Sequence, residues 1–168
     1  MIPSIRGQRG IRIALRLIAA LAGVAAKLGT SAGGGEPGDL AKFRVIADGI
    51  PKAIGRARGD AGRGRALILG RESANCVLCH EIPETGLRFS GKLAPSLDGV
   101  ARTLTVAQLR LRVVDNMRLN PMTIMPSYYR IEGFDQVAGA YRGKPILEAE
   151  QIEDIVAYLA TLKMSSAQ

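Results

Sequence analysis

The sequence predicts a mainly α-helical protein of one domain, with two long loops that need something to wrap around. Three observations support this fold class. Apolar residues recur at helical spacing in stretches that begin with capping residues, and no segment alternates in polarity for long enough to require a sheet. Proline and glycine gather in two long segments between the helices. A chain of 168 residues can bury a sizeable core without disulfide bonds, because chains of this size bury about 68–70% of their unfolded surface.

Residues 1–32 have the pattern of a secretory signal peptide. They hold five basic and no acidic side chains, and an apolar run of ten residues extends from Leu17 to Ala26. A transmembrane helix needs about 20 apolar residues, whereas the core of a signal peptide needs roughly 7–15. We therefore expect cleavage near Ala32 and no membrane anchor after processing. An amphipathic N-terminal anchor is the alternative.

The next segment, residues 33–58, is expected to be an N-terminal extension that contains a helix. Asp39 can cap this helix, and Pro51 can end it. The apolar residues at helical spacing are Leu40, Phe43, Ala47 and Ile50.

The main domain is expected over residues 59–168, with three helices. The first covers residues 60–69, and the second begins at Thr105 in a capping-box pattern and must finish before Pro121. The third covers residues 148–162 and has a continuous apolar stripe. Four acidic residues are expected to act favourably near its positive N-terminal end: Glu148, Glu150, Glu153 and Asp154. The stretches between the helices, residues 81–103 and 121–147, are the long loops, and loops of that length are usually functional.

The charge of the chain does not indicate a nucleic-acid-binding protein. Without residues 1–32 the formal net charge falls from +8 to +3, and the remaining excess lies in residues 42–71. A nucleic-acid surface combines a basic stripe with aromatic side chains, and only Phe43 lies in that segment. We expect a solvated basic surface there, with a docking face for an acidic protein as the alternative.

The segment Cys76-Val77-Leu78-Cys79-His80 concentrates the ligand-forming residues of the chain. C-x-x-C-H is the attachment signature of c-type haem, in which the two thiols add to the vinyl groups and the histidine becomes an axial iron ligand. One helical turn separates the thiols, so both can reach one edge of a porphyrin. The sequence therefore predicts covalent attachment through Cys76 and Cys79 and iron ligation by His80.

Two other interpretations of this motif fit less well. A redox disulfide is expected in a thioredoxin-like βαβ setting, which the sequence does not show. A structural zinc site needs four ligands, and the chain has only two cysteines and one histidine.

The single histidine leaves the sixth iron position to a methionine, water or an outside ligand. Four methionines follow it, and each can also be explained as core filler. Met164 lies beyond the last helix, and Met117 lies on or just after a helix. Met122 and Met125 lie in a proline-bounded loop, where Pro126 stiffens the chain beside Met125. Position therefore favours Met125 over Met122, and a thioether ligand would raise the reduction potential.

Two further segments resemble class I cytochromes c. Residues 59–67 resemble the N-terminal helix of that family, in which a glycine permits close crossing of the C-terminal helix. Gly64 matches this glycine, and Tyr158 matches the aromatic residue near it. Residues 94–99 resemble the segment whose proline carbonyl accepts the proton of the ligand histidine, which implies that role for Pro95. The resemblance implies a class I cytochrome c fold with an N-terminal helical extension.

A more specific resemblance covers roughly residues 58–163. The chain is similar to SoxX, the family of monohaem subunits of the sulfur-oxidation cytochromes SoxAX. In that family the methionine of the M-P-S-Y-Y segment is the distal iron ligand, which implies Met125. The strings that carry the resemblance are T-I-M-P-S-Y-Y-R (residues 123–130), Y-R-G-K-P-I-L (141–147), E-Q-I-E-D-I-V-A-Y-L-A-T-L (150–162) and L-R-L-R-V-V-D (109–115).

This resemblance implies a function as well as a fold. SoxAX is a periplasmic L-cysteine S-thiosulfotransferase that joins thiosulfate oxidatively to a cysteine of the carrier protein SoxYZ, with the active-site cysteine on SoxA. The resemblance implies one covalently bound haem c and a heterodimer with a SoxA-type cytochrome. It also implies contact with SoxYZ through the complex and a downstream cytochrome c as electron acceptor. This chain would accept electrons and perform no sulfur chemistry alone.

Two other functions remain open at this point. The chain could be a freestanding periplasmic electron carrier, or a haem-containing structural or sensor module. The long extension over residues 33–58 favours a partner-binding subunit over a minimal carrier.

Overall fold

The computed structural model describes residues 40–72, 74–84, 86–87 and 89–163, all within the compact unit that comprises residues 35–168. The proposed signal peptide, residues 1–32, lies outside the described residues. The same holds for Asp39 and Met164.

The described residues form a mainly α-helical fold, as predicted. Four α-helices are present, and no strand is found in the described ranges beyond one isolated bridge between Ile46 and Gly49. In the same ranges, no helix is long and apolar enough to cross a membrane. The helices are α1 (Ala61–Leu69), α2 (Val100–Thr103), α3 (Val106–Asp115) and α4 (Ala149–Leu159), and the 3-10 turns are Cys76–Leu78, Asn116–Arg118 and Gly139–Tyr141.

The three long helices begin where the capping residues predict. The side chain of Asp60 accepts a hydrogen bond from the Arg63 N–H at the start of α1, at 2.7 Å. At the start of α3, Thr105 and Gln108 form the complete capping box. The N–H of Glu148 donates to the side-chain oxygen of Gln151 at the start of α4, at 2.8 Å. Local sequence signals therefore determine these helix starts.

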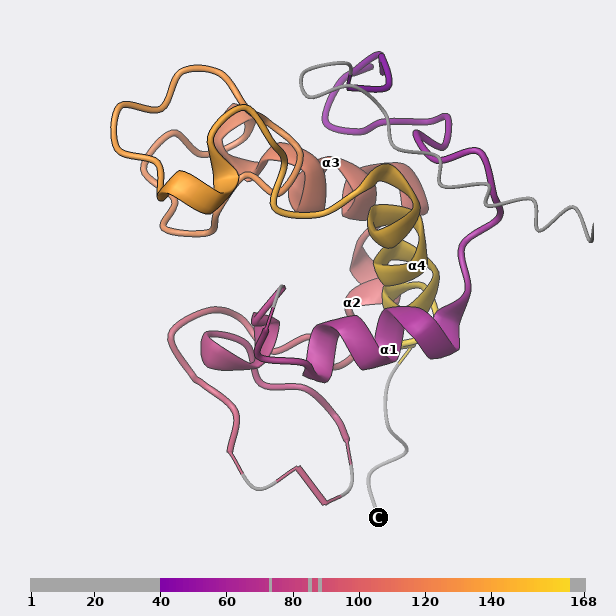
Figure 1. Ribbon diagram of the computed structural model, residues 1–168. Coiled ribbons are helices and arrows are strands. Elements are labelled where there is room, and N and C mark those ends of the chain that lie inside the picture. Colours follow the sequence, from indigo (N-terminus) through magenta and orange to yellow (C-terminus); the bar gives the residue numbers. More distant parts are fainter. Residues whose placement is uncertain (1–39, 73, 85, 88, 164–168) are drawn as a thin grey trace, which may run out of the picture. The chain divides into compact units, whose positions relative to one another are not determined.

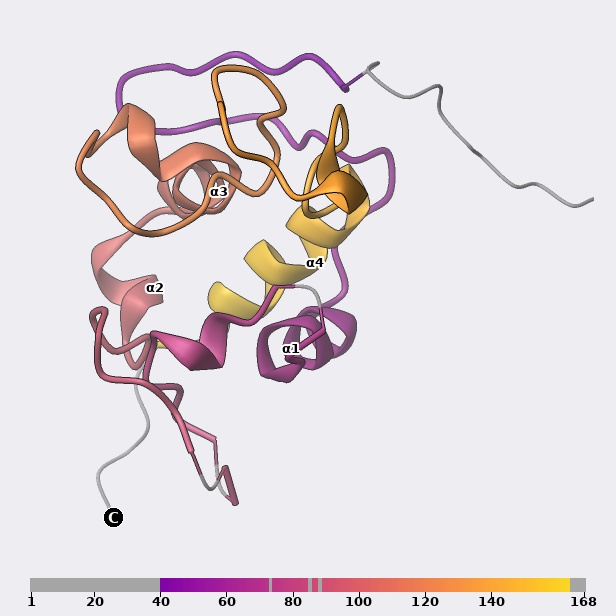
Figure 2. The same cartoon turned by 60° about the vertical axis from the view of Figure 1, so that its left-hand side comes forward.

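Helix α1 crosses α4 at very short range (Figures 1 and 2). A Cβ atom on Gly64 would collide with the carbonyl oxygen of Asp154 on α4, and one on Gly59 would collide with that of Glu153. The Asp154 carboxylate accepts the N–H of Asp60 at 2.7 Å. Gly64 therefore lies at the crossing that the sequence predicts, and only glycine fits there without displacing a backbone.

The prediction of a helix over residues 39–50 is wrong. Residues 40–45 have no regular structure, and residues 46–49 form a tight turn closed by the isolated bridge. Ala47 has a φ of 51°, a left-handed conformation that an α-helix cannot contain. The segment instead lies against α3, because the N–H of Ile50 donates to the carbonyl of Ala107 at 2.9 Å.

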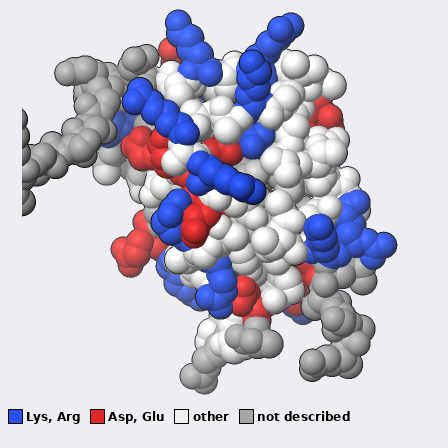
Figure 3. Space-filling model, turned by 90° about the vertical axis from the view of Figure 1, so that its right-hand side faces the viewer, with Lys and Arg blue, Asp and Glu red and all other residues white. Residues whose placement is uncertain are grey.

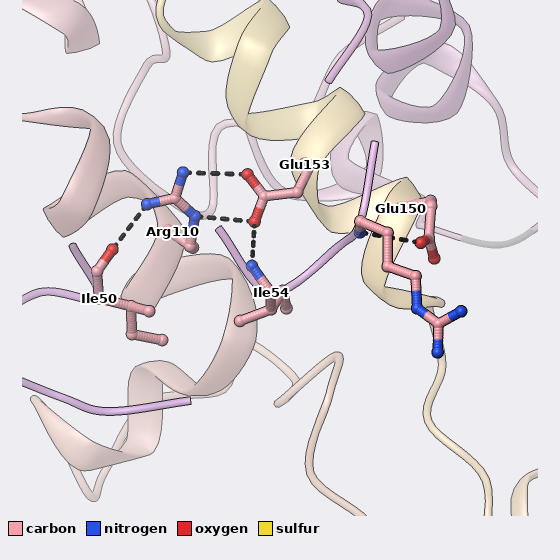
Figure 4. A network of polar contacts seen from close by, with 6 residues as sticks. Ile50, Ile54, Arg110, Glu150 and Glu153 are labelled. Atoms are coloured by element: carbon pink, nitrogen blue, oxygen red, sulfur yellow. Dashed lines mark hydrogen bonds and ion pairs between the residues drawn. The ribbon is translucent and has the colours of Figure 1, made fainter. Parts of the chain in front are cut away.

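A buried ion pair holds this N-terminal segment to the core (Figure 4). Arg110 on α3 donates to both carboxylate oxygens of Glu153 on α4, at 2.8 and 2.9 Å, and each side chain is 6% exposed. The same carboxylate accepts the N–H of Ile54 at 2.9 Å, and the guanidinium also donates to the Ile50 carbonyl at 2.6 Å. Ile50 and Ile54 are themselves buried. The segment 40–58 is thus packed on its own domain, with Ile50 and Ile54 in the core.

Two basic residues of the segment 42–71 lie beside acidic side chains. Figure 3 shows the Lys and Arg side chains scattered over the viewed face, with Asp and Glu side chains between them. Arg63 pairs with Asp154 and Arg65 pairs with Glu84, each at 2.7 Å. This arrangement fits the solvated surface that the sequence predicts.

Candidate functional site

The C-x-x-C-H segment forms one tight helical turn. The N–H groups of Cys79 and His80 both donate to the carbonyl oxygen of Cys76, at 3.2 and 2.9 Å. Asn75 enters this turn with a φ of 49°, a left-handed conformation in which asparagine is enriched. The turn therefore holds both cysteines and the histidine at adjacent positions.

The long loop that follows folds back over this turn. The N–H of Gly91 donates to the carbonyl of Val77 at 2.8 Å, and the N–H of Ala94 donates to that of Cys79 at 2.9 Å. A Cβ atom on Gly91 would collide with the carbonyl oxygen of Leu78. The loop can lie this close only because residue 91 is glycine.

His80 is oriented by Pro95. Its Nδ1 atom lies 2.7 Å from the Pro95 carbonyl oxygen, which can only accept a hydrogen bond. Nδ1 therefore carries the proton, and the lone pair of neutral imidazole lies on Nε2, where it can coordinate a metal. This is the contact that the resemblance to class I cytochromes c implies.

His80, Cys76 and Met125 line one apolar cavity of about 260 Å³. Its walls come from α1, α3, α4 and both long loops, so the cavity lies where the elements of the fold meet. A second cavity of about 330 Å³ adjoins the first, since both are lined by Cys76, His80 and Met125. We call the first the inner cavity and the second the outer cavity. Cys79 lines this second cavity. The apolar wall residues of the first cavity are Ile68, Leu97, Val100, Leu104, Leu109, Val113, Leu147, Ile155 and Leu159.

A short hydrogen-bonded loop presents Met125. The N–H of Met125 donates to the hydroxyl oxygen of Thr123 at 3.1 Å, and that hydroxyl oxygen also accepts a hydrogen bond from the Asn116 side chain at 3.1 Å. Asn116 follows directly on α3, so the loop is fixed to the end of that helix. Sequence reasoning identified Met125 but missed Asn116 and Thr123, whose contact spans seven residues and has no local signature.

The other described methionines are placed differently. Met122 is 87% exposed and lines only the outer cavity. The Met117 sulfur accepts a hydrogen bond from Arg130 at 3.1 Å, and Met117 lines neither cavity beside His80. Among the described methionines, only Met125 lines the inner cavity with His80.

The segment around Met125 is held by buried polar contacts. The hydroxyl of Ser127 donates to the buried carboxylate of Asp115, which also pairs with Arg118 and Arg130 at 3.3 and 3.4 Å. The hydroxyl of Tyr128 donates to the carbonyl of Ala74 at 2.7 Å, just before the C-x-x-C-H turn. The M-P-S-Y-Y-R string therefore connects the methionine loop to α3 and to the segment before the C-x-x-C-H turn.

Burial changes the acidity of groups beside the cavity. Desolvation raises the pKa of the Cys76 thiol to about 11, and burial also raises the pKa of the Tyr128 hydroxyl above its usual range. Both groups are therefore neutral at physiological pH. Cys76 thus lacks the thiolate character of a redox-active cysteine.

A polar cluster that the sequence did not predict holds the start of the long loop. Glu84 accepts two hydrogen bonds from Arg65 on α1, at 2.8 and 2.7 Å, and one from the Tyr158 hydroxyl on α4, at 2.6 Å. The bonds from Arg65, and then from Tyr158, hold the pKa of the Glu84 carboxyl below its usual range. Tyr158, expected as an aromatic residue near Gly64, thus also links α4 to the loop after His80.

The residues present fit a haem c group. The two cysteines and the histidine share one turn, the imidazole has its Nε2 lone pair available, and a thioether lines the same apolar cavity. No cluster of three or more His, Cys, Asp or Glu residues within the described ranges could hold a bare metal ion. The donor set therefore suits an iron held by a macrocycle and only capped by protein ligands.

Comparison with known proteins gives the same assignment. Residues 63–163 match the cytochrome c family model, so the chain belongs to the cytochrome c family, whose members bind haem covalently and transfer electrons. The chain is also similar to a solved structure described as the crystal structure of SoxXA from P. pantotrophus. The match has 34% sequence identity and a TM-score of 0.67, and it covers 72% of this chain and 94% of that chain. No curated protein matches the sequence. These findings confirm the sequence-based resemblance to the SoxX type of cytochrome c.

The placement of the methionines gives a first prediction. Replacing Met125 with alanine should abolish the sulfur-to-iron charge-transfer absorption of the ferric protein. It should also lower the midpoint potential by on the order of 0.1 V, within the range of about 0.8 V over which axial ligands set haem potentials. Met122→Ala is the matched control, because this exposed side chain should affect neither property. Absorption spectra and redox titration check the result, and loss of the band in Met122→Ala instead would show that the ligand assignment is wrong.

Proposed function

We propose that this chain is the haem c electron-transfer subunit of a periplasmic, thiosulfate-oxidising SoxAX complex. It accepts electrons that are released when thiosulfate is joined to a cysteine of a SoxYZ-type carrier protein. The observation that carries this proposal is the similarity to SoxXA over 94% of the matched chain, together with a site suited to a single haem c.

The reaction assigns a defined task to this chain. A carrier thiol and thiosulfate combine to a thiosulfonate-linked cysteine, with formation of one S–S bond and release of one proton and two electrons. A haem linked through thioethers to Cys76 and Cys79, with His80 and Met125 as the protein ligands of its iron, would supply one-electron acceptance at a raised potential. The residues of this chain bind and orient that group, and the apolar walls exclude water from it.

The chain itself has no group for the sulfur chemistry. Its only cysteines, Cys76 and Cys79, are assigned to the haem linkages, and its only histidine is assigned to iron. No thiol is then left to carry sulfur, and no imidazole is left to act as a general base. The thiol chemistry is therefore assigned to a SoxA-type partner.

An apolar rim around the outer cavity is suited to the partner contact. Leu93, Met122 and Ile124 line this cavity and are 69%, 87% and 72% exposed. No Lys, Arg, Asp or Glu lines it among the described residues. Exposed apolar side chains that gather at one site are typical of interaction surfaces. Docking through this rim would bring the partner close to the cavity that holds His80 and Met125.

The test is co-expression with a SoxA-type cytochrome, followed by size-exclusion chromatography. We expect a heterodimer whose amount falls only modestly between low and physiological ionic strength, because an uncharged rim gains little from electrostatic steering. Ile124→Asp should weaken the complex strongly, since it places a charge in the apolar contact. Val106→Asp is the control: Val106 is also exposed, but it lies in the first turn of α3, away from both cavities, where an acidic residue is tolerated.

A second experiment separates this proposal from a freestanding carrier. The oxidised chain is incubated with thiosulfate and a carrier thiol, and haem reduction and the mass of the carrier are followed. Reduction and conjugate formation only after addition of the SoxA-type partner support the proposal. Conjugate formed at catalytic rates by the isolated chain would contradict it. A stable monomer that no SoxA-type protein binds would favour the freestanding carrier.

A further inference from the structure

A third cavity is lined by residues between 117 and 146. It shares a wall with the outer cavity at residues 123–126, but its basic residues line neither cavity beside His80. Its volume is about 360 Å³, and no Asp or Glu lines it among the described residues. Two basic side chains line it, Arg130 and Lys144, and these come from the M-P-S-Y-Y-R and G-K-P-I-L strings. The haem site gives no role to either cation.

Arg130 is incompletely paired. Its Nη1 atom donates to Asp115 at 3.4 Å, and its Nη2 atom donates to the thioether sulfur of Met117 at 3.1 Å. Its Nε atom is buried, and within the described residues it has no hydrogen-bond partner. A buried donor without an acceptor is unfavourable, because it has lost its hydrogen bonds to water without replacement.

Other arginines of the chain show what this edge of a guanidinium normally binds. Arg63, Arg65 and Arg110 each donate through Nε and Nη2 together to both oxygens of one carboxylate, at 2.7–2.9 Å. In Arg130 the same Nε and Nη2 edge faces only a sulfur atom, which is a weak acceptor. The chain thus supplies a two-donor fork but no pair of oxygens for it.

The surroundings suit a small anion. Asp115 also accepts hydrogen bonds from Ser127 and Arg118, so Arg130 does not have this carboxylate to itself. Lys144 is exposed and forms no ion pair with any described residue. Met117 lines the same cavity, and its flexible side chain can yield the arginine edge to a better acceptor.

We propose that this cavity binds a small tetrahedral oxyanion of the sulfate, thiosulfate or phosphate class. Two of its oxygens accept from the Nε and Nη2 atoms of Arg130 in place of the Met117 sulfur, and Lys144 supplies the second positive charge. The site does not depend on the role in sulfur oxidation, because the argument rests on the Arg130 edge, on Lys144 and on the cavity that both line.

The experiment is a titration of the haem-loaded protein with sulfate, thiosulfate or phosphate, with the ionic strength held constant by chloride. Nitrogen-edited NMR follows the arginine Nε–H signals, and calorimetry gives the dissociation constant. We expect one saturable site that shifts the Arg130 Nε–H signal. Absence of saturable binding for all three anions, or tighter binding of acetate than of any of them, would overturn the proposal.

Three variants locate the site. Arg130→Lys keeps the charge beside Asp115 but removes the fork, so binding should weaken about tenfold or more. Lys144→Gln should weaken binding by about threefold, as for an exposed ion pair, and its exposed position keeps the test valid if the Arg130 variant does not fold. Arg142→Gln is the matched control, because Arg142 lies in the same loop but does not line the cavity. Equal weakening by Arg142→Gln and Lys144→Gln would show general screening and overturn the site.

Discussion

Replacing Cys76 and Cys79 together with serine should abolish covalent haem attachment and unfold the domain. The walls of the inner cavity are mostly apolar, with nine aliphatic side chains among the residues that line it. Without a bound macrocycle these groups meet water, and the loss exceeds what a domain with a net stability of about 5–15 kcal/mol can absorb. Haem staining measures covalent attachment, and circular dichroism and protease digestion measure folding.

Single variants serve as controls for this experiment. Cys79→Ser retains the Cys76 linkage and the imidazole of His80, so it should retain part of the haem-loaded, folded protein. Cys76 lines both cavities beside His80, whereas Cys79 lines only the outer one, so Cys76→Ser should lose more. A double variant that stays helical and protease-resistant without haem would contradict the view that the cofactor completes the core.

The sequence predicted those parts of the fold that local signals determine. The helices at α1, α3 and α4 begin at residues whose side chains cap them, and the apolar spacing follows the buried face. The C-x-x-C-H turn and the proline-bounded methionine could be identified because they are contiguous motifs. Gly64 could be identified because the family resemblance marks the residue at which two helices cross.

The N-terminal segment could not be predicted in this way. Leu40, Phe43, Ala47 and Ile50 have helical spacing. The conformation of the segment is nevertheless determined by contacts with residues that are distant in sequence. Tyr129 accepts the N–H of Ala41 at 3.0 Å across 88 residues. Tertiary contacts of this kind override local periodicity. The finding also changes the interpretation of residues 40–58: they pack on their own domain, so their length no longer supports a partner-binding arm.

Two acidic residues of α4 show the same limit. Glu153 and Asp154 were expected to interact favourably with the positive end of the helix. In the structure both are buried beyond the first turn, where Glu153 pairs with Arg110 and Asp154 pairs with Arg63. A sequence shows the charge of a residue but not which side chain of another helix lies opposite it.

The buried pair gives the second large prediction. Glu153→Ala should destabilise the protein by about 3–5 kcal/mol, because it leaves the Arg110 guanidinium buried without its counter-charge. It also removes the acceptor of the Ile54 N–H, so the segment 40–58 should become accessible to protease. Denaturant unfolding of the haem-loaded protein measures the change in stability, and mass spectrometry of the digest locates the cuts.

Glu150→Ala is the matched control for this prediction. Glu150 lies one turn earlier on α4 and accepts the N–H of Arg56 at 3.1 Å, so it also contacts the N-terminal segment, but at an exposed position. Water can replace that contact, and the expected cost is below about 1 kcal/mol. The double variant Arg110→Met, Glu153→Leu removes both charges and should recover only part of the loss, because the backbone groups of Ile50 and Ile54 still lack their partners. If the double variant regains full stability, the pair is a replaceable core contact; if only part returns, the ion pair serves mainly to bind the backbone of the N-terminal segment.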